Sequence, residues 1–220
     1  MRVAIVTVLT AFLCYVAPAQ DAPGKDPARE TKGVGIPPRA TPADYQAHAQ
    51  AGTVTVGAEF KGHSVPTPEA VYTNEDYVAV EVGLFGPPEA RVKLSHDDFS
   101  LRIDGKKNLI PCLPYAAVFR GLKDPEWIPP GGADSKSKSS ISTGGGKNDN
   151  SLPAVVHMPI ELERAMDQRV QKASLLEGER ALPEAGLIFF EHRGRTDRIH
   201  SIELIYTGPA GKATMALRPE

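Results

Sequence analysis

Apolar and polar residues alternate along several stretches of the chain, and a period of two is typical of strands with one buried face. The alternation is clearest in residues 54–60, 77–84 and 97–103. Asp104-Gly105 follows the third stretch and reads as a two-residue hairpin turn. Shorter runs predict further strands at 91–95, 113–119, 186–192, 198–208 and 211–217.

One short segment carries the signals of a helix before the first strand. Thr41 is a suitable N-cap, Pro42 suits the first helical position, Asp44 suits the first turn, and Gly52 can end the helix. We therefore expect a helix of about two turns over 41–51.

A longer helix is predicted over 159–177, starting at Pro159 and ending before Gly178. Its apolar residues share one face at helical spacing. They are Leu162, Met166, Val170, Ala173 and Leu176. This pattern favours a helix packed on the core. A helix lying on a membrane surface is the weaker alternative, because the opposite face mixes acidic and basic residues.

The remaining segments set the domain organisation. Residues 1–19 read as a cleavable secretory signal, with one basic residue, a short apolar run and small residues at the cleavage site. Residues 20–40 are polar and rich in Pro and Gly, which predicts a disordered tether. A Gly/Ser/Lys-rich stretch at 131–151 is expected to be a flexible insertion within one domain, 41–220. The segments on either side of it are each too small to bury a core alone.

The strand count indicates a mainly β fold. About seven or eight short strands match an immunoglobulin-like antiparallel β-sandwich. We therefore expect such a sandwich, interrupted by the insertion and by one amphipathic helix.

Part of the chain resembles a known family. "EDYVAVEVGLFGPPEARVKLSHDDFSLRIDGKK", with alternating valines and a strand ending at Asp-Gly, is similar to secreted bacterial immunoglobulin-like domains of the mycobacterial immunogenic-protein type. "LPEAGLIFFEH" and "IHSIELIYTGPAGKATMAL" resemble their closing strands. The whole chain is also similar to exported proteins of soil acidobacteria. The resemblance implies a β-sandwich without enzymatic activity, and it supplies no catalytic residues.

Composition narrows the possible partners. The formal net charge is −2, with no basic block of the kind that binds nucleic acid. After signal cleavage no stretch approaches the roughly 20 apolar residues of a membrane helix. Cys112 is then the one remaining thiol, so it is either buried and inert or paired between chains. We expect a buried thiol, because apolar residues and prolines surround it.

The sequence offers little catalytic chemistry. Ser95, His96 and Asp97 are adjacent, so their side chains would point to opposite faces of a strand and could not form a triad. No nucleophile-elbow motif or phosphate-binding loop is present. We expect neither enzymatic activity nor a cofactor.

A metal site is the best chemical alternative. If 189–204 formed a hairpin turning near Thr196, His192 and His200 would be cross-strand neighbours able to share an ion. His96 or Asp97 could supply a third ligand. Two solvated histidines at a hairpin rim are the commoner arrangement.

Two further features point to interaction surfaces. Arg193, Arg195 and Arg198 could meet an acidic partner, although interleaved acidic residues favour a mixed, solvated face. Trp127 either packs over one end of the domain or stands as an exposed aromatic anchor.

These observations favour a secreted or periplasmic, non-enzymatic module that is structural or binds an envelope or extracellular protein. The alternative is a periplasmic metal-binding protein using His192 and His200.

Overall fold

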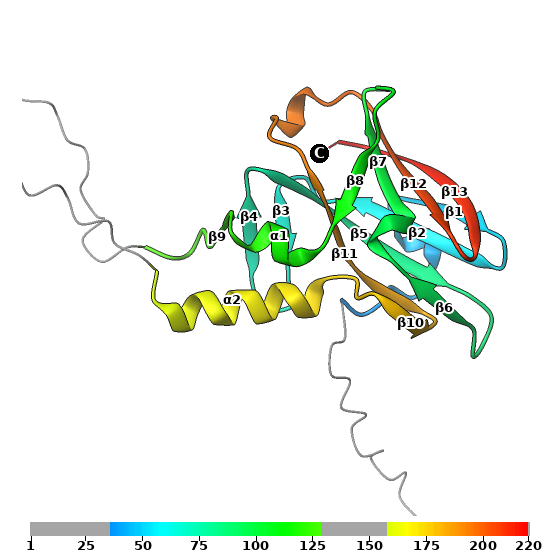
Figure 1. Ribbon diagram of the computed structural model, residues 1–220, viewed down its shortest axis with the longest axis horizontal. Helices are drawn as coiled ribbons and strands as arrows, with labels where there is room; N and C mark the ends of the chain where they lie inside the picture. The colour runs from blue at the N-terminus through cyan, green and yellow to red at the C-terminus, as the bar shows by residue number, and fades with distance from the viewer. Residues whose placement is uncertain (1–35, 129–157, 220) are drawn as a thin grey trace, which may run out of the picture. The chain divides into compact units, whose positions relative to one another are not determined.

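A computed structural model of the chain describes residues 36–128 and 158–219. The mainly β prediction is confirmed, because eight strands form one antiparallel sheet in the order β1-β2-β5-β11-β8-β7-β12-β13 (Figure 1). Their bounds are Ala47–Ala51 (β1), Val54–Phe60 (β2), Tyr77–Phe85 (β5), Glu184–Glu191 (β11), Ile110–Leu113 (β8), Phe99–Ile103 (β7), Ile202–Gly208 (β12) and Gly211–Leu217 (β13). The predicted signal, the insertion at 131–151 and all but the end of the tether lie outside the described residues.

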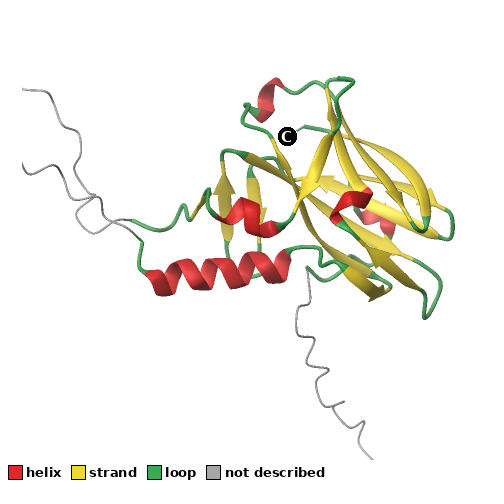
Figure 2. Ribbon diagram, viewed as in Figure 1, coloured by secondary structure: helices red, strands yellow, loops and turns green. Residues whose placement is uncertain are grey.

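Smaller elements flank this sheet (Figure 2). One three-stranded sheet has the order β3-β4-β9, and β6 pairs with β10. Their bounds are Ser64–Pro66 (β3), Val71–Asn74 (β4), Leu122–Lys123 (β9), Arg91–Leu94 (β6) and Gly178–Ala181 (β10). The helices are α1 (Tyr115–Phe119) and α2 (Ile160–Ala173), with 3-10 turns at Pro42–Asp44, His96–Asp98 and Thr196–Arg198.

The predicted sandwich is corrected to a nearly closed, barrel-like sheet. The reason is β8, which pairs through Leu113 and Cys112 with β11 and through Ile110 and Pro111 with β7. This short strand joins what would have been two sheets into one. The outer strands β1 and β13 then approach each other, and the Gln46 side chain donates to the Arg218 carbonyl oxygen at 3.1 Å.

The apolar residues form two cores. The larger lies inside the curled sheet and includes Val80, Val82 and Phe190. The smaller lies on the other face of β5 and β11, where Ala79 and Phe189 pack with residues of α1, α2 and β4. Strands β5 and β11 are therefore buried on both faces, which explains their nearly continuous apolar sequence.

The helix predicted over 41–51 is wrong. Only Pro42–Asp44 form a 3-10 turn, after which β1 pairs with β2. The buried Tyr45 side chain lies directly over Gly57 and Gly83, where an added Cβ would fall 2.6 Å and 2.5 Å from ring carbons. This ring packing fixes an extended chain and overrides the local helix signals.

The strand predicted over 113–119 is also wrong beyond Leu113. Pro114 is the N-cap of α1, and Val118 is the residue that α1 buries. The helix predicted over 159–177 is confirmed in a shorter form, α2. A turn does form at Asp104-Gly105, with φ values of 53° and 63°, but the predicted two-residue hairpin is wrong, because β8 begins only at Ile110.

A charge cluster lies on the outer face of β2 and β5. The Glu81 side chain is 8% exposed and accepts from Arg39 through both carboxylate oxygens at 3.0 Å. Lys61 Nζ lies 3.1 Å from the same carboxylate, and Glu59 pairs with both cations. Two cations therefore balance two carboxylates at this face.

Candidate functional site: the face around helix α1

The arginines singled out by sequence lie in a mixed-charge loop. Arg193 pairs with Asp76 at 3.4 Å and with Glu191 at 3.5 Å, and Arg195 pairs with Asp197. The Arg195–Asp197 pair lowers the pKa of the Asp197 carboxyl. Arg198 is exposed at the end of the same 3-10 turn. An acidic-partner surface here stays a prediction, and carboxylates already occupy part of it.

The hairpin assumed for His192 and His200 does not form. Strand β11 pairs with β5 and β8, whereas β12 pairs with β7 and β13, so the segment between them crosses from one part of the sheet to another. His200 is exposed, with Nδ1 3.7 Å from Asp104. His192 instead stacks on His63, with ring centroids 6.2 Å apart. A metal site shared by His192 and His200 stays a prediction, but the cross-strand pairing that it assumed does not form.

Ser95, His96 and Asp97 form a structural turn. Ser95 Oγ accepts from the Asp97 amide, and its hydroxyl donates to Glu177 at 3.1 Å. His96 donates its amide to the same Glu177 oxygen at 2.9 Å, and this bond lowers the pKa of Glu177. The Ser95 hydroxyl and the His96 imidazole both face the Glu177 carboxylate, and the residues lie in a 3-10 turn instead of the expected strand.

The expected burial of Cys112 is confirmed. The residue is 5% exposed, and burial raises the pKa of its thiol to about 12. Trp127 is half-buried, and its amide donates to the Asp124 carbonyl oxygen in a turn after β9.

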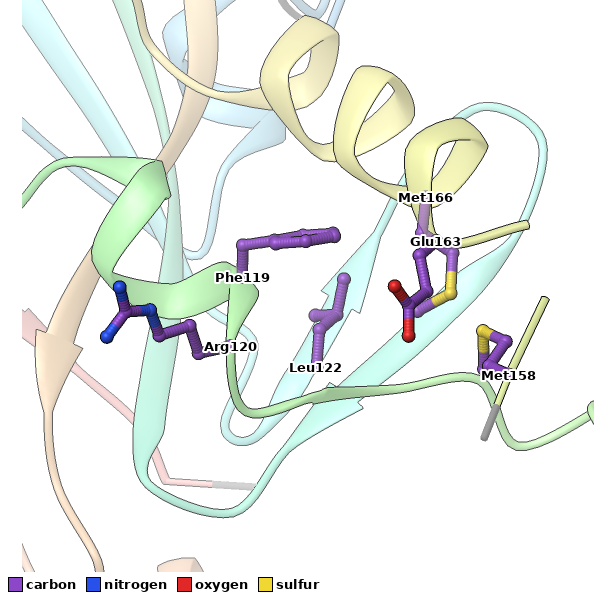
Figure 3. A pocket seen from close by; sticks show the side chains of 6 residues that line it. All are labelled: Phe119, Arg120, Leu122, Met158, Glu163 and Met166. Carbon is purple, nitrogen blue, oxygen red and sulfur yellow. The ribbon is translucent and has the colours of Figure 1, made fainter. Parts of the chain in front are cut away.

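An apolar hollow that the sequence did not single out lies between α1 and α2. Its volume is about 330 Å³. Phe119 and Leu122 line it on one side and Met158 and Met166 on the other (Figure 3). The exposed Ile160 begins the helix that carries Met166. Apolar side chains facing a solvent-accessible hollow are the usual lining of a binding site.

Two charged side chains flank this hollow. Figure 3 shows Arg120 and Glu163 on opposite sides of Leu122. Both residues are exposed, and Arg120 has no carboxylate within ion-pair distance among the residues the structure describes. The hollow therefore has an apolar floor with the Glu163 carboxylate on one side. Arg120 stands at its edge with no ion-pair partner among the described residues, and its guanidinium points away from Leu122 (Figure 3).

A second, polar hollow of about 510 Å³ lies on the other side of α1. Its lining includes Asp76, Tyr77 and the same Arg120. Arg120 therefore borders both hollows, with α1 between them.

One buried side chain fixes α1 in this position. Asn74 is fully buried, and its Nδ2 donates to the Val118 carbonyl oxygen at 2.7 Å. Its Oδ1 accepts from the Asp76 amide at 2.9 Å. Gly121 packs directly on this amide group, where an added Cβ would lie 2.9 Å from Nδ2. Asn74 thus couples α1 to the turn that lines the polar hollow.

Sequence reasoning missed Phe119, Arg120, Asn74 and His63, because none belongs to a motif. The closest available signal was Met166 on the apolar face predicted for α2.

Within the described ranges, no group of three or more His, Cys, Asp or Glu side chains is placed to hold a metal ion. No helix in those ranges is long and apolar enough to cross a membrane. The chain was compared with protein-family models, curated proteins and solved structures, and none of the three comparisons gave a match.

Proposed function

We propose that the protein is an exported, non-enzymatic binding module that captures a short peptide segment of a partner protein between α1 and α2. The observation that carries the proposal is the apolar hollow bordered by Arg120, which has no ion-pair partner in the described part of the chain. Export rests on the signal-like residues 1–19. The resemblance to secreted immunoglobulin-like domains favours the same class of non-enzymatic module, although the strands here curl into one sheet.

The chemistry of the hollow defines the occupant. A floor containing Met158 and Met166 suits an apolar side chain, because the unbranched thioether adapts to its partner. The Arg120 guanidinium suits a carboxylate, which it can bind through two parallel hydrogen bonds. Glu163, on the other side, suits a basic group. A peptide offering an apolar residue between an acidic and a basic residue meets all three requirements.

The volume fits a small occupant. A hollow of about 330 Å³ lies at the lower end of the range for small-molecule sites. It therefore accommodates one or two side chains, as expected of a site for a short peptide segment.

A random peptide library displayed on phage, selected on the immobilised protein, tests this proposal. We expect enriched peptides to place an apolar residue beside Asp or Glu. Fluorescence anisotropy then measures the Kd of one synthetic peptide. Arg120→Glu should raise this Kd about tenfold, because it replaces a charge-assisted hydrogen bond with repulsion.

Matched variants separate a local effect from a folding defect. Leu122→Asp places a charge in the hollow and should abolish binding, whereas Leu109→Asp changes an exposed leucine of the β7–β8 loop and should leave the Kd unchanged. Circular dichroism checks the folding of each variant. Recovery of no enriched peptide, or an Arg120→Glu variant with wild-type affinity, would contradict the proposal.

A further inference from the structure

The polar hollow beside α1 is lined by side chains of opposite charge. Its volume is about 510 Å³, and its lining includes Arg120 at the end of α1 and Asp76 in the β4–β5 turn. The Arg120 side chain points away from Leu122 and therefore away from the floor of the apolar hollow (Figure 3). Tyr77 and the exposed Ala116 add apolar surface to the polar hollow. The lining thus combines a cation, an anion and a small apolar area.

The guanidinium group of Arg120 is available to a ligand. The side chain is exposed, and in the described part of the chain no carboxylate lies within ion-pair distance of it. A guanidinium group binds a carboxylate through two parallel hydrogen bonds. Arg120 therefore favours a ligand that carries a carboxylate.

The carboxylate of Asp76 is only weakly paired. Its Oδ1 lies 3.4 Å from Arg193 Nε, and both side chains are more than half exposed. Exposed ion pairs of this kind contribute little to stability, so a ligand can compete for the carboxylate. Arg193 also lies 3.5 Å from Glu191, so it keeps one partner if Asp76 turns to a ligand. Asp76 can therefore accept a hydrogen bond from an ammonium group.

The charges of the hollow and its border cancel. The guanidinium groups of Arg120 and Arg193 are balanced by the carboxylates of Asp76 and Glu191. A purely anionic ligand would match Arg120 and repel Asp76, and a purely cationic ligand would do the reverse. A dipolar ion, which carries a carboxylate and an ammonium group on one molecule, matches both residues and leaves the net charge unchanged.

One buried side chain holds the backbone on both sides of the hollow. Asn74 Nδ2 donates at 2.7 Å to the carbonyl oxygen of Val118, two residues before Arg120, and Asn74 Oδ1 accepts from the Asp76 amide at 2.9 Å. The Asp76 carbonyl oxygen accepts in turn from the His192 amide at 2.9 Å. The segments that carry the cation and the anion are therefore held in place before a ligand binds, which lowers the entropic cost of binding.

We propose that the polar hollow binds a small dipolar ion of the dipeptide class, with its carboxylate on Arg120 and its ammonium group on Asp76. A dipeptide carries these two groups at opposite ends of an extended molecule, as a site with its cation and anion on different elements requires. The volume of about 510 Å³ lies within the range of small-molecule sites. Although Arg120 borders both hollows, this site does not depend on peptide capture in the apolar hollow.

Nuclear magnetic resonance of the ¹⁵N-labelled protein tests the site by titration with L-alanyl-L-alanine. At roughly pH 6.5 both ends of this dipeptide are charged. We expect the amide signals of 74–77 and 116–121 to shift, with a Kd on the order of 1 mM for a ligand of about eleven heavy atoms. The amides of β12 and β13 should not shift and provide the internal reference. If neither segment responds at about 10 mM dipeptide, tenfold above that Kd, the proposal is wrong.

Paired changes in ligand and protein identify the two contacts. Asp76→Asn should raise the Kd of the dipeptide about tenfold, because it removes a charge-assisted hydrogen bond. It should leave unchanged the Kd of the N-acetylated dipeptide, which has no ammonium group. Arg120→Gln should likewise raise the Kd of the dipeptide about tenfold and leave that of the dipeptide amide unchanged. A variant that affects the dipeptide and its blocked analogue equally would refute the proposal.

Two control variants separate this site from the apolar hollow and from a general effect of charge. Met158 lines the apolar hollow on the side away from Arg120 (Figure 3). Met158→Asp should therefore weaken peptide capture there and leave the Kd of the dipeptide unchanged. Arg102→Gln removes a cation of β7 that does not line the polar hollow, and it should also leave this Kd unchanged. Loss of dipeptide binding in either control would overturn the proposal.

Discussion

At the scale of single residues, Glu81 is the buried charge that most needs compensation by neighbouring cations. Its carboxylate is on a strand buried on both faces, where an unpaired charge would be strongly unfavourable. Arg39 approaches it through two hydrogen bonds and Lys61 through a third contact, so the carboxylate is fully paired. The arginine also stacks on the Tyr45 ring at 4.5 Å. Glu81 thus attaches the start of the described chain to the outer face of the sheet.

Replacing Glu81 should therefore destabilise the protein substantially. We expect Glu81→Ala to lower the free energy of unfolding by about 3 kcal/mol, because it leaves two partly buried cations sharing one carboxylate. Urea denaturation followed by circular dichroism measures the change. The matched control is Glu203→Ala, whose partner Arg102 lies 2.9 Å away in a half-buried pair that is more exposed than that of Glu81. Glu203→Ala should lower the free energy of unfolding by less than about 1 kcal/mol. If both variants lowered it equally, the pairing of Glu81 would be no more important than that of Glu203.

At the scale of elements, the α1 face depends on a short helix that could not hold its place alone. Five residues are too few for a stable isolated helix. Val118 anchors α1 in the smaller core, and the Asn74 side chain satisfies the Val118 carbonyl oxygen. The same side chain accepts from the Asp76 amide, so one buried group positions both the helix and the turn.

Asn74→Ala should release both elements together. The loss removes one of the donors to the Val118 carbonyl oxygen, which also accepts from the Gly121 amide, and it leaves the Asp76 amide without its partner. It should therefore cost about 1–3 kcal/mol in the free energy of unfolding. Hydrogen exchange should show faster exchange of the α1 and 74–77 amides, with β12 and β13 unaffected. Asn108→Ala, at an exposed position in the β7–β8 loop, is the control. Uniform loss of protection across the sheet would instead show that Asn74 supports the whole fold.

At the scale of the whole molecule, periodicity predicted individual strands better than their pairing. The alternation in 54–60 and 77–84 corresponds to β2 and β5. The stretch predicted over 97–103 contains β7, which begins at Phe99 after a 3-10 turn. It could not predict that β8, a four-residue strand containing Pro111, would join the two halves of the sheet, because pairing depends on distant partners. The same limit applies to the α1 face and to His63, whose ring contacts carbonyl oxygens of two segments distant in sequence. Tertiary contacts also overrode local signals at 41–51.

His192 should shape the dependence of stability on pH. Because the pKa of His192 is lowered in the folded protein, the unfolded chain binds more protons than the folded chain as the solution is acidified below roughly pH 6.5. The contribution of His192 to stability is therefore fully present above the pKa that this residue has in the unfolded chain. It is lost as the pH falls below that pKa. Urea denaturation between roughly pH 7 and pH 5 should show this loss, and His192→Phe, which keeps a planar ring without a proton site, should reduce it.

The pH range and a control variant together assign the loss of stability in acid to His192. Carboxylates with a lowered pKa, such as Asp104 and Glu177, lose their contribution only at more acidic pH, so they do not account for a change above roughly pH 5. His48→Phe, on the exposed side of β1, should leave the profile unchanged. If the dependence of unfolding free energy on pH were the same in His192→Phe, other groups would cause the loss of stability in acid.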